Sequence, residues 1–400
     1  MKLEQFLQDK PLFYKEIDYT RMPRAWASIK LNLKPFKIIH IIGTNGKGST
    51  GRFLAQILRL NGVSVGHYTS PHIFKFNERF WLNGEIVSDE LLQDTHERLL
   101  SMLSDEFRVK TSYFEYATLL AALLFESCDY FICEAGMGGE LDATNVFDKC
   151  LSVFTPIGID HISTLGNTLE AISTTKFKAM CDTALLNDDM NEISVKIAFN
   201  IAKSLGSNLK FASETLNDND KKQIKIYADK FDLADFLHSN LTLASAAAKI
   251  LLEKLDISNL TDLDLRGRCE KVASNLYVDV GHNELGAVAI VSKFSSNEFK
   301  DKKLTLIYNT FMDKDFHAVL SVLKPILKQV LIYHYDCDGR ELGGKNLIKA
   351  LDKLGIIYRK FDNSDMSEIL VKNSDEIYLA FGSFYLVEAF LRDYYAGKGL

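Results

Sequence analysis

The chain has 400 residues, of which 47% are hydrophobic and 25% charged, and its formal net charge is -6. A chain of this length usually exceeds what one hydrophobic core can serve, so we expect two domains. The negative charge provides no overall attraction to nucleic acid or to an anionic membrane surface, and we expect neither as a partner.

No segment has the pattern of export or membrane insertion. The amino-terminal region is charged from its first residues and lacks the apolar core of a signal peptide. The longest apolar helical run, residues 119–125, is far shorter than the roughly 18 residues that a membrane helix needs. Six scattered cysteines form no CxxC pair, which is typical of reduced thiols. We therefore expect a cytoplasmic protein.

The first half of the chain alternates short apolar runs with helical stretches. This alternation predicts an α/β fold in which helices cover a parallel sheet. Each apolar run ends in Gly, Ser, Asp or His, and open parallel sheets bind ligands at such strand ends. The expected strands are residues 37–42, 63–68, 130–133 and 151–154, and the first expected helix is residues 50–60.

The pattern is less regular in the middle of the chain and then resumes. Residues 187–233 are polar and rich in turn signals, so no elements are assigned there. An alanine-rich helix is expected at 241–255, followed by a linker at 256–264. Further strands are expected at 304–308, 330–333 and 377–381, with helices between them. We therefore divide the chain into domains 1–260 and 265–400.

The sequence GTNGKGS, residues 43–49, lies between the first expected strand and its helix. Glycines allow backbone N–H groups to face a phosphate, and the helix N-terminus adds partial positive charge. Lys47 can neutralise the β- and γ-phosphates of ATP, and Ser49 can approach a metal ion or a phosphate oxygen; Asn45, Gly46 and Gly48 complete the loop. The spacing departs from GxxxxGK[ST], because Gly48 separates Lys47 from Ser49. A glycine-rich turn without a ligand is the alternative interpretation.

Two further residues are candidates on chemistry alone. Glu134 ends an apolar strand, where its carboxylate can hold Mg²⁺ directly or through water. His161 follows Asp160 after the next expected strand. Histidine is an unusual Mg²⁺ ligand, so a hydrogen-bonding role for His161 is an equal alternative.

The loop and five other motifs together resemble the folylpolyglutamate synthase branch of the Mur ligase superfamily. YTSPH at 68–72 with NER at 77–79 resembles that family's YTSPH…ER, and YFE at 113–115 matches its YFE. EAGMGGELDATN at 134–145 resembles EVGLGGRLDATN, and IDH at 159–161 resembles the family's IGLDH. The resemblance implies a P-loop-type, parallel-sheet ATPase domain and a smaller, Rossmann-like carboxy-terminal α/β domain.

The same resemblance implies a magnesium site and a modified lysine. In the family, the serine of TSP, the glutamate of EVGLGG and the histidine of LDH bind magnesium; here they are Ser70, Glu134 and His161. The family's IAxEKAGI segment carries a lysine carbamylated by CO₂, which corresponds here to Lys176. Lys178 replaces a glycine of that motif and is a rival position. Lys47, Lys176 and His161 are therefore the expected catalytic residues.

A flat pterin calls for aromatic rings and hydrogen-bonding carboxylates. Phe114 and Glu115 are candidates, although an aromatic pair at the start of an apolar helix is often part of the core. The resemblance implies that Leu141, Asp142 and Ala143 contact the pteroate. Residues 19–22 match the family's LGLER segment poorly, and Glu140 reverses the charge of the family's arginine.

In the second half of the chain, the resemblance implies further ATP contacts. Asn240 precedes the alanine-rich segment, GRCE at 267–270 resembles PGRFE, and DVGHN at 279–283 resembles DxAHNP. Asn240, Arg268 and Asp279 are therefore expected to contact ATP. His282 and Ser383 are assigned to the glutamate side.

The implied reaction is ligation of L-glutamate to dihydropteroate, and to the γ-carboxylate of reduced folates, with ATP and Mg²⁺ as cofactors and with the enzyme acting as a monomer. A Mur-type ligase of UDP-sugars shares the loop, but the YFE, LDATN and TSPH…ER segments argue against it. A regulatory ATPase without ligase activity is the alternative from another class. A second alternating domain with GR and HN motifs argues against that alternative.

Overall fold

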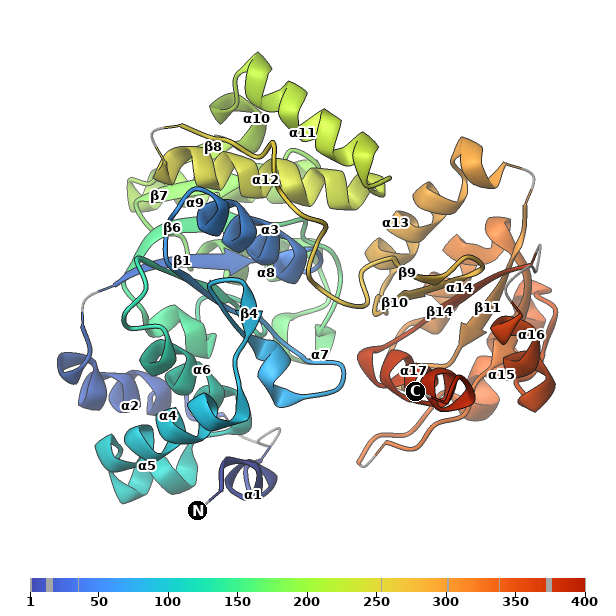
Figure 1. Ribbon diagram of the computed structural model, residues 1–400, viewed down its shortest axis with the longest axis horizontal. Helices are drawn as coiled ribbons and strands as arrows, with labels where there is room; N and C mark the ends of the chain where they lie inside the picture. Colours follow the sequence, from blue (N-terminus) through green and yellow to red (C-terminus); the bar gives the residue numbers. More distant parts are fainter. Residues whose placement is uncertain are drawn as a thin grey trace. The chain divides into compact units, whose positions relative to one another are not determined.

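The computed structural model describes residues 2–11, 17–34, 36–252, 254–300, 302–337, 339–371 and 376–399. These residues form two compact units (Figure 1). The first consists of Met1–Leu233 and Leu237–Asp264, and the second of Ala234–Phe236 and Leu265–Leu400. Each unit contains a mainly parallel sheet with helices packed on it, so the predicted α/β class is confirmed.

The sheet of the first unit has eight strands in the order β4-β3-β2-β5-β1-β6-β7-β8. The strands are β1 Lys37–Ile42, β2 Val65–Tyr68, β3 Phe80–Leu82, β4 Glu85–Ile86, β5 Tyr130–Glu134, β6 Lys149–Phe154, β7 Thr183–Leu186 and β8 Asn208–Phe211. Strand β3 pairs antiparallel with both β2 and β4, and the other neighbouring strands pair parallel. The phosphate-loop strand β1 therefore lies in the middle of the sheet, between β5 and β6.

Helices occupy both faces of this sheet (Figure 1). They are α1 Leu3–Gln8, α2 Arg21–Ile29, α3 Lys47–Leu60, α4 Asp89–Met102, α5 Asp105–Lys110, α6 Tyr113–Leu124, α7 Ile162–Leu165, α8 Leu169–Phe177, α9 Glu192–Leu205, α10 Ala212–Thr215, α11 Asp218–Lys230 and α12 Asp235–Leu251. Short 3₁₀ turns are η1 Lys30–Asn32, η2 Phe76–Arg79 and η3 Ala143–Val146.

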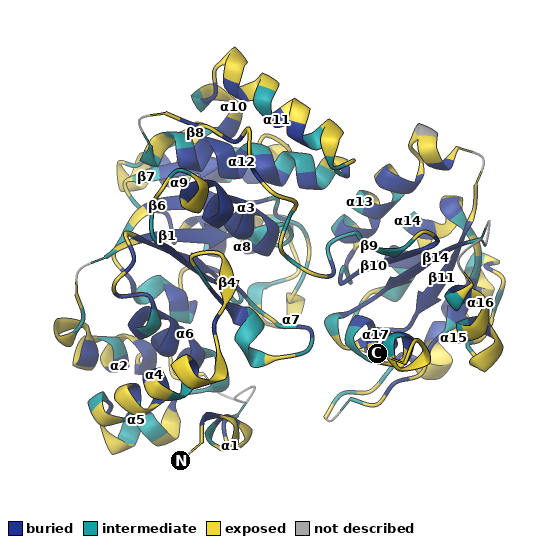
Figure 2. Cartoon of the chain, viewed as in Figure 1, coloured by how far each residue is buried: buried dark blue, intermediate teal, exposed yellow. Residues whose placement is uncertain are grey.

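The side chains of β1 show why the strand reads as a continuous apolar run. Ile39 and Ile41 pack into a core with α3, α11 and α12. Ile38 faces the other side and packs into a core with α2, α4 and α6. A central strand of a parallel sheet is buried on both faces, so apolar residues occupy successive positions. Figure 2 shows this burial as a dark band through the sheet.

Two predicted helix starts need correction. Helix α3 begins at Lys47, before the predicted residue 50, because Gly46 has a φ of 88° and acts as its N-cap. Helix α12 begins at Asp235, before the predicted residue 241, so Asn240 lies inside this helix and does not precede it. The predicted start was placed where the alanine-rich part begins. The helix extends further towards the amino terminus, because Leu237 is buried on its packed face as well.

Residues 187–233, which the sequence pattern left unassigned, contain α9, β8, α10 and α11. In α11 most side chains are polar, and its buried residues are only Asp220, Ile224 and Tyr227. An exposed helix with so narrow an apolar face gives a weak periodic signal. Tertiary packing therefore determines where these three helices and the strand form, because the local sequence pattern does not.

The linker before the second unit is held by the helix that follows the phosphate loop. Asn61 Nδ2 donates to the Asp256 carbonyl at 3.0 Å, and Gln56 Nε2 donates to the Asp262 carbonyl at 2.9 Å. The Trp81 indole N–H donates to Asp264 Oδ2 at 2.9 Å. The linker is therefore a part of the first unit up to its last residue.

The second unit has a six-stranded sheet in the order β13-β12-β11-β14-β10-β9. The strands are β9 Glu270–Ala273, β10 Leu276–Asp279, β11 Leu304–Tyr308, β12 Leu327–Ile332, β13 Tyr358–Lys360 and β14 Ile377–Phe381. The helices are α13 Glu284–Phe294, α14 Phe316–Leu323, α15 Gly344–Leu354, α16 Asn363–Leu370 and α17 Phe384–Gly397, with 3₁₀ turns η4 Asn297–Phe299 and η5 Lys324–Ile326. Only β9 runs antiparallel to its neighbour.

Within the described part of the chain, every helix is too short or too polar to cross a bilayer. All six cysteines are free thiols.

Candidate active site

The phosphate loop, residues 43–46, connects β1 to α3. A Cβ added at Gly46 would lie 2.5 Å from Oδ1 of Asn240, and one added at Gly43 would lie 1.9 Å from Oγ1 of Thr155. Gly46 also has a positive φ, which favours glycine. Both glycines are therefore required by the packing, and Asn240 of α12 lies directly against the loop.

The segment that follows β6 fixes the loop from its other side. The backbone N–H groups of Thr44 and Asn45 donate to the Pro156 carbonyl at 3.0 and 3.3 Å. The Thr44 hydroxyl donates to the Gly158 carbonyl and accepts from its N–H, each at 3.1 Å. The loop conformation is therefore defined by contacts within the protein.

The first turn of α3 presents hydroxyl groups that need a partner. Ser49 Oγ and Thr50 Oγ1 are both buried, and neither has a hydrogen-bond partner among the residues that the structure describes. An unpaired buried hydroxyl costs about 1–3 kcal/mol. Gly48, which is also buried, lets the helix start without a side chain at this point. The Ser49 hydroxyl thus suits the predicted contact with a metal ion or a phosphate oxygen.

Lys47 and Glu134 face each other beside the loop. Parallel pairing aligns Ile41 of β1 with Glu134 of β5, so this carboxylate lies at the carboxyl ends of the strands, as the loop does. Lys47 Nζ donates to the Thr44 carbonyl at 3.1 Å and lies 3.9 Å from Glu134 Oε1. Glu134 Oε2 accepts the Ser70 N–H at 3.2 Å. The structure therefore brings Lys47, Glu134 and Ser70 together.

This donor set is compatible with Mg²⁺. The ion keeps several waters and usually takes one or two protein carboxylates together with phosphate oxygens. Glu134 supplies a buried carboxylate that accepts the Ser70 backbone N–H, and the buried Ser49 lies in the first turn of the helix that follows the phosphate loop. No group of three His, Cys, Asp or Glu side chains that could hold a metal is found among the described residues. A metal here would therefore depend on nucleotide oxygens as well.

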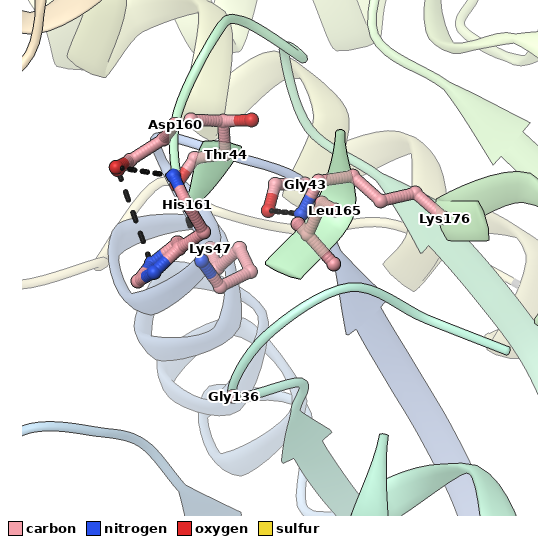
Figure 3. Close-up of a pocket in the computed structure, with 8 residues that line it drawn as sticks. All are labelled: Gly43, Thr44, Lys47, Gly136, Asp160, His161, Leu165 and Lys176. Carbon is pink, nitrogen blue, oxygen red and sulfur yellow. Dashed lines mark hydrogen bonds and ion pairs between the residues drawn. The ribbon is translucent and has the colours of Figure 1, made fainter. Parts of the chain in front are cut away.

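His161 lines a small cavity together with Lys47 (Figure 3). It is the residue before α7, has a left-handed φ of 51°, and its side chain is 47% exposed. Its N–H donates to Asp160 Oδ1 at 2.8 Å, and its Nε2 lies 4.0 Å from Asp160 Oδ2. The structure thus places His161 close to the phosphate loop, and its role as a magnesium ligand stays a prediction.

Lys176 points into the same cavity, whose volume is about 20 Å³ (Figure 3). Its Nζ donates to the Gly43 carbonyl at 2.7 Å. Burial, together with the positive charge of Lys47, lowers the pKa of the Lys176 amine to about 7. A substantial fraction of this amine is therefore neutral at physiological pH, and neutral amines are the reactive form. The cavity is lined by Gly43, Thr44, Lys47, Gly136, Asp160, His161, Leu165 and Lys176.

The rival Lys178 has a different environment. Its ammonium pairs with Glu140 at 3.0 Å, and both side chains are more than 40% exposed, at 48% and 43%. It does not line the cavity that holds Lys176. Of the two lysines, Lys176 is the one placed at the phosphate loop.

The predicted pteroate residues lie in the segments beside β5. The Phe114 ring packs over Gly136, where an added Cβ would lie 2.6 Å from the ring. The Glu115 carboxylate accepts from Arg21 Nε at 2.9 Å and from the Ser112 N–H at 2.7 Å. Glu115 therefore joins α2 to the start of α6 and caps that helix, a structural task beside any contact with a substrate.

The segment at 141–143 presents one exposed and one buried candidate. The Leu141 side chain is 57% exposed, and Ala143 packs against the core of α2, α4 and α6. The buried Asp142 carboxylate accepts the N–H of Met137 at 2.7 Å and that of Thr144 at 2.9 Å. Asp142 therefore fixes the shape of this loop from inside.

In the second unit, Arg268 and Asp279 belong to one small network. The Arg268 guanidinium lies over the Phe384 ring, 5.1 Å from its centroid. Asp279 accepts the N–H groups of Cys269 at 2.8 Å and Gly281 at 2.7 Å. Burial raises the pKa of the Asp279 carboxyl, although these N–H groups and Arg268 oppose the shift. Asp279 therefore fixes the backbone that carries Arg268.

The two residues assigned to the glutamate side also lie in the second unit. His282 Nδ1 is 3.2 Å from the Val280 carbonyl. The Ser383 hydroxyl accepts the Leu386 N–H at 3.0 Å as the N-cap of α17, and lies 3.1 Å from the Tyr335 hydroxyl. Ser383 thus has a structural role that the sequence motif alone did not reveal.

Comparison with known proteins decides the family. A Buchnera aphidicola (subspecies Schizaphis graminum) protein named dihydrofolate synthase/folylpolyglutamate synthase is 31% identical over 395 residues, covering 90% of this chain and 88% of that protein. The solved Helicobacter pylori folylpolyglutamate synthetase is 38% identical, covers 98% of both chains and superposes with a TM-score of 0.76. A Yersinia pestis structure, described as bifunctional folylpolyglutamate synthase/dihydrofolate synthase complexed with AMPPNP and Mn ion, supports the fold at 24% identity and a TM-score of 0.78, covering 95% of this chain and 94% of that one. No general family model matches the chain.

The chain belongs to the dihydrofolate synthase/folylpolyglutamate synthase family. The resemblance inferred from the motifs is therefore confirmed, as is the predicted enzyme class, an ATP-dependent ligase. The Buchnera and Helicobacter proteins each match nearly the whole length of this chain, so the similarity to this enzyme family includes both units.

The structure explains two departures from the family motifs. Glu140 stands where the family's EVGLGGRLDATN has arginine, and Lys178 stands where IAxEKAGI has glycine. These two unusual side chains form an ion pair with each other, at 3.0 Å. The reversed charge is thus neutralised locally, and an exposed pair of this kind contributes at most about 1 kcal/mol.

Three residues that contact the predicted site residues or line the same cavity received no role from the sequence. The Thr69 hydroxyl donates to Glu134, Asp160 lines the cavity, and Arg21 holds Glu115. Thr69 directly precedes Ser70, and Asp160 directly precedes His161. This closeness in the sequence was the signal that could have indicated a role for each of them. Arg21 lies in the poorly matched segment at 19–22, where only its charge could have indicated a buried partner.

Proposed function

We propose that this chain joins L-glutamate to dihydropteroate, and also to the γ-carboxylate of reduced folates. The observation that carries the proposal is the convergence of Lys47, Glu134 and Lys176 on one phosphate loop. The names of the relatives support the substrates: the Buchnera protein is named for both activities, and a Saccharomyces cerevisiae relative, 29% identical over 80% of this chain, is named dihydrofolate synthetase. We propose ATP and Mg²⁺ as cofactors; the Yersinia protein binds AMPPNP and Mn ion.

The first chemical step activates the acceptor. A pteroate carboxylate oxygen attacks the γ-phosphorus of ATP, the bond to the β-phosphate oxygen breaks, and ADP leaves. The Lys47 ammonium offsets negative charge that accumulates on the transferring phosphoryl group. When bound, Mg²⁺ would supply further charge neutralisation at the same oxygens, with Glu134, Ser70 and His161 as the proposed ligands.

The second step forms the amide. The glutamate amine attacks the acyl carbon of the acyl phosphate, the bond to phosphate breaks, and the nitrogen loses a proton. Water would hydrolyse this intermediate, so the reaction requires a site that excludes it. We assign ATP and pteroate binding to the domain at 1–260. We assign the remaining ATP contacts, Arg268 and Asp279, and the glutamate contacts, His282 and Ser383, to the domain at 265–400.

The other ATP and pteroate contacts follow from the loops described above. Asn45, Gly46, Lys47, Gly48 and Ser49, together with Asn240, are proposed to hold the nucleotide. Phe114, Glu115, Leu141, Asp142 and Ala143 are proposed to hold the pteroate. We further propose that the enzyme acts as a monomer in the cytoplasm, without a nucleic-acid or membrane partner; its free cysteines support a reducing compartment.

The decisive assay is ADP release measured with each substrate omitted in turn. We expect release only when ATP, a pteroate acceptor and L-glutamate are all present. Dihydropteroate and tetrahydrofolate, compared as acceptors, separate the first glutamylation from later ones. Release with ATP alone would instead identify a regulatory ATPase, and release that requires a UDP-sugar would identify a Mur-type ligase.

Glu134→Gln and His161→Ala are expected to raise the Mg²⁺ concentration needed for half-maximal activity, by about tenfold or more for Glu134→Gln. Glutamine keeps the shape of the side chain but removes the charge that attracts the cation. The measurement is ADP release titrated with MgCl₂ at saturating substrates. Glu126→Gln, which alters another buried carboxylate paired with Arg98, is the matched control and should leave the titration unchanged. Wild-type titration curves in both variants would assign Glu134 and His161 structural roles.

A further inference from the structure

A hydrogen-bonded chain runs from the phosphate-loop strand to the proposed pteroate loop. His40 lies in β1, three positions before the loop begins at Gly43, and is fully buried. Its Nε2 lies 2.7 Å from the Thr144 hydroxyl in η3. That hydroxyl in turn donates to Asp142 Oδ1 at 2.5 Å. One strand therefore carries the phosphate loop at its end and a contact to the pteroate loop in its middle.

The direction of each hydrogen bond follows from the Asp142 carboxylate, at which this hydrogen-bonded chain ends. An ionised carboxylate only accepts, so the Thr144 hydroxyl must donate its one hydrogen to Asp142. The same hydroxyl must therefore accept from His40, which requires the hydrogen on Nε2. His40 Nδ1 is then the bare nitrogen, in agreement with its having no hydrogen-bond partner within the described residues. Burial and the nearby Lys149 charge hold the pKa of His40 well below its ordinary value, so the ring is neutral.

The same accounting leaves one acceptor position on Asp142. Oδ1 accepts two hydrogens, from the Thr144 hydroxyl and the Thr144 N–H. Oδ2 accepts one hydrogen, from the Met137 N–H at 2.7 Å. Each carboxylate oxygen has two lone pairs, so a single lone pair on Oδ2 remains for another donor. The orientation of this lone pair depends on the contacts at Oδ1.

We propose that His40 is a positioning residue which, through the Thr144 hydroxyl, orients Asp142 so that Oδ2 accepts one N–H group of the pterin. The proposal rests on the proposed function, because it takes the pteroate to be the ligand of this loop. Neither His40 nor Thr144 needs to touch the substrate. Their effect is to prevent rotation of a carboxylate that would otherwise be held by backbone N–H groups alone.

The test separates acceptor binding from general stability. Thr144→Val keeps the side-chain volume and removes the hydroxyl, so we expect the KM for dihydropteroate to rise about tenfold, as for the loss of one well-placed hydrogen bond. The KM values for ATP and glutamate should change less than twofold. His40→Leu should give the same pattern, and the double variant should be no worse than either single one, because both break the same chain.

Conservative variants and a matched control complete the experiment. Thr144→Ser and His40→Gln retain a donor at the required position and should restore the acceptor KM to within about threefold of wild type. Thr95→Val removes another buried threonine hydroxyl, one that donates to the Leu91 carbonyl at 2.7 Å, and should leave every KM unchanged. Equal changes in all three KM values, or additive effects in the double variant, would overturn the proposal. A wild-type protein that releases no ADP with any pteroate acceptor would instead refute the proposed function, and with it the role of Asp142.

Discussion

Lys47→Ala is expected to abolish measurable turnover while the protein stays folded. Lys47 lies at the phosphate loop, where its Nζ is 3.9 Å from Glu134 Oε1 and donates to the Thr44 carbonyl at 3.1 Å. Removing one charge that stabilises a phosphoryl-transfer transition state typically costs about 3–4 kcal/mol, which lowers kcat by roughly 10²–10³-fold. The measurement is single-turnover ADP formation at saturating ATP and acceptor.

The control for Lys47→Ala lies on the same helix. Arg59→Ala removes a cation near the other end of α3, where Nε donates to the Asn83 carbonyl at 2.9 Å, and should retain wild-type kcat. Thermal unfolding of both variants should stay within a few degrees of wild type, because neither side chain fills the core. Product formation by Lys47→Ala at a wild-type rate would remove the phosphate loop from the mechanism.

Lys176→Ala is expected to lose most activity, and small carboxylic acids should restore part of it. The Lys176 ammonium first loses a proton, and the neutral amine then forms an N–C bond with CO₂ and releases a second proton, so a cationic side chain becomes an anionic carbamate. The neutral fraction of Lys176 grows as the pH rises through its pKa of about 7, so carbamate formation is favoured at and above neutral pH. The carbamate would lie in the cavity that Lys47 also lines, where its negative charge would attract a cation.

The rescue experiment distinguishes ligation from screening. Formate or acetate should raise the rate of Lys176→Ala several-fold, whereas chloride at equal ionic strength should not. In wild-type protein, ¹³C-labelled bicarbonate should give a carbamate resonance that Lys176→Ala lacks. Lys178→Ala is the matched control, because it removes only an exposed ion pair with Glu140 and should keep both the activity and the resonance.

Each contrary outcome has a defined meaning. Full activity in Lys176→Ala combined with loss in Lys178→Ala would move the modified position by two residues. An inactive Lys176→Ala that no carboxylate restores, together with wild-type protein that shows no carbamate resonance, would show that Lys176 is unmodified and has a structural role. The contact that serves this role would be its hydrogen bond to the Gly43 carbonyl, at 2.7 Å.

Much of this protein is determined locally by its sequence. The buried strands at 37–42, 304–308 and 377–381 have the predicted bounds, because central parallel strands need continuous apolar residues regardless of their neighbours. The position of the phosphate loop between strand and helix follows from glycine spacing, and the positive φ of Gly46 favours glycine at that point. The family also follows from sequence, because its motifs keep their order along the whole chain.

Other features depend on contacts between residues that are far apart in the chain. The start of α12, the helices at 187–233 and the position of Asn240 against Gly46 are decided by packing, which short-range periodicity does not encode. The choice between Lys176 and Lys178 needed the burial of one and the Glu140 pairing of the other. The chain from His40 to Asp142 spans about a hundred residues, 104 between His40 and Thr144. Hydrogen bonds of this kind are set by the geometry of the folded sheet, so only the tertiary structure could reveal them.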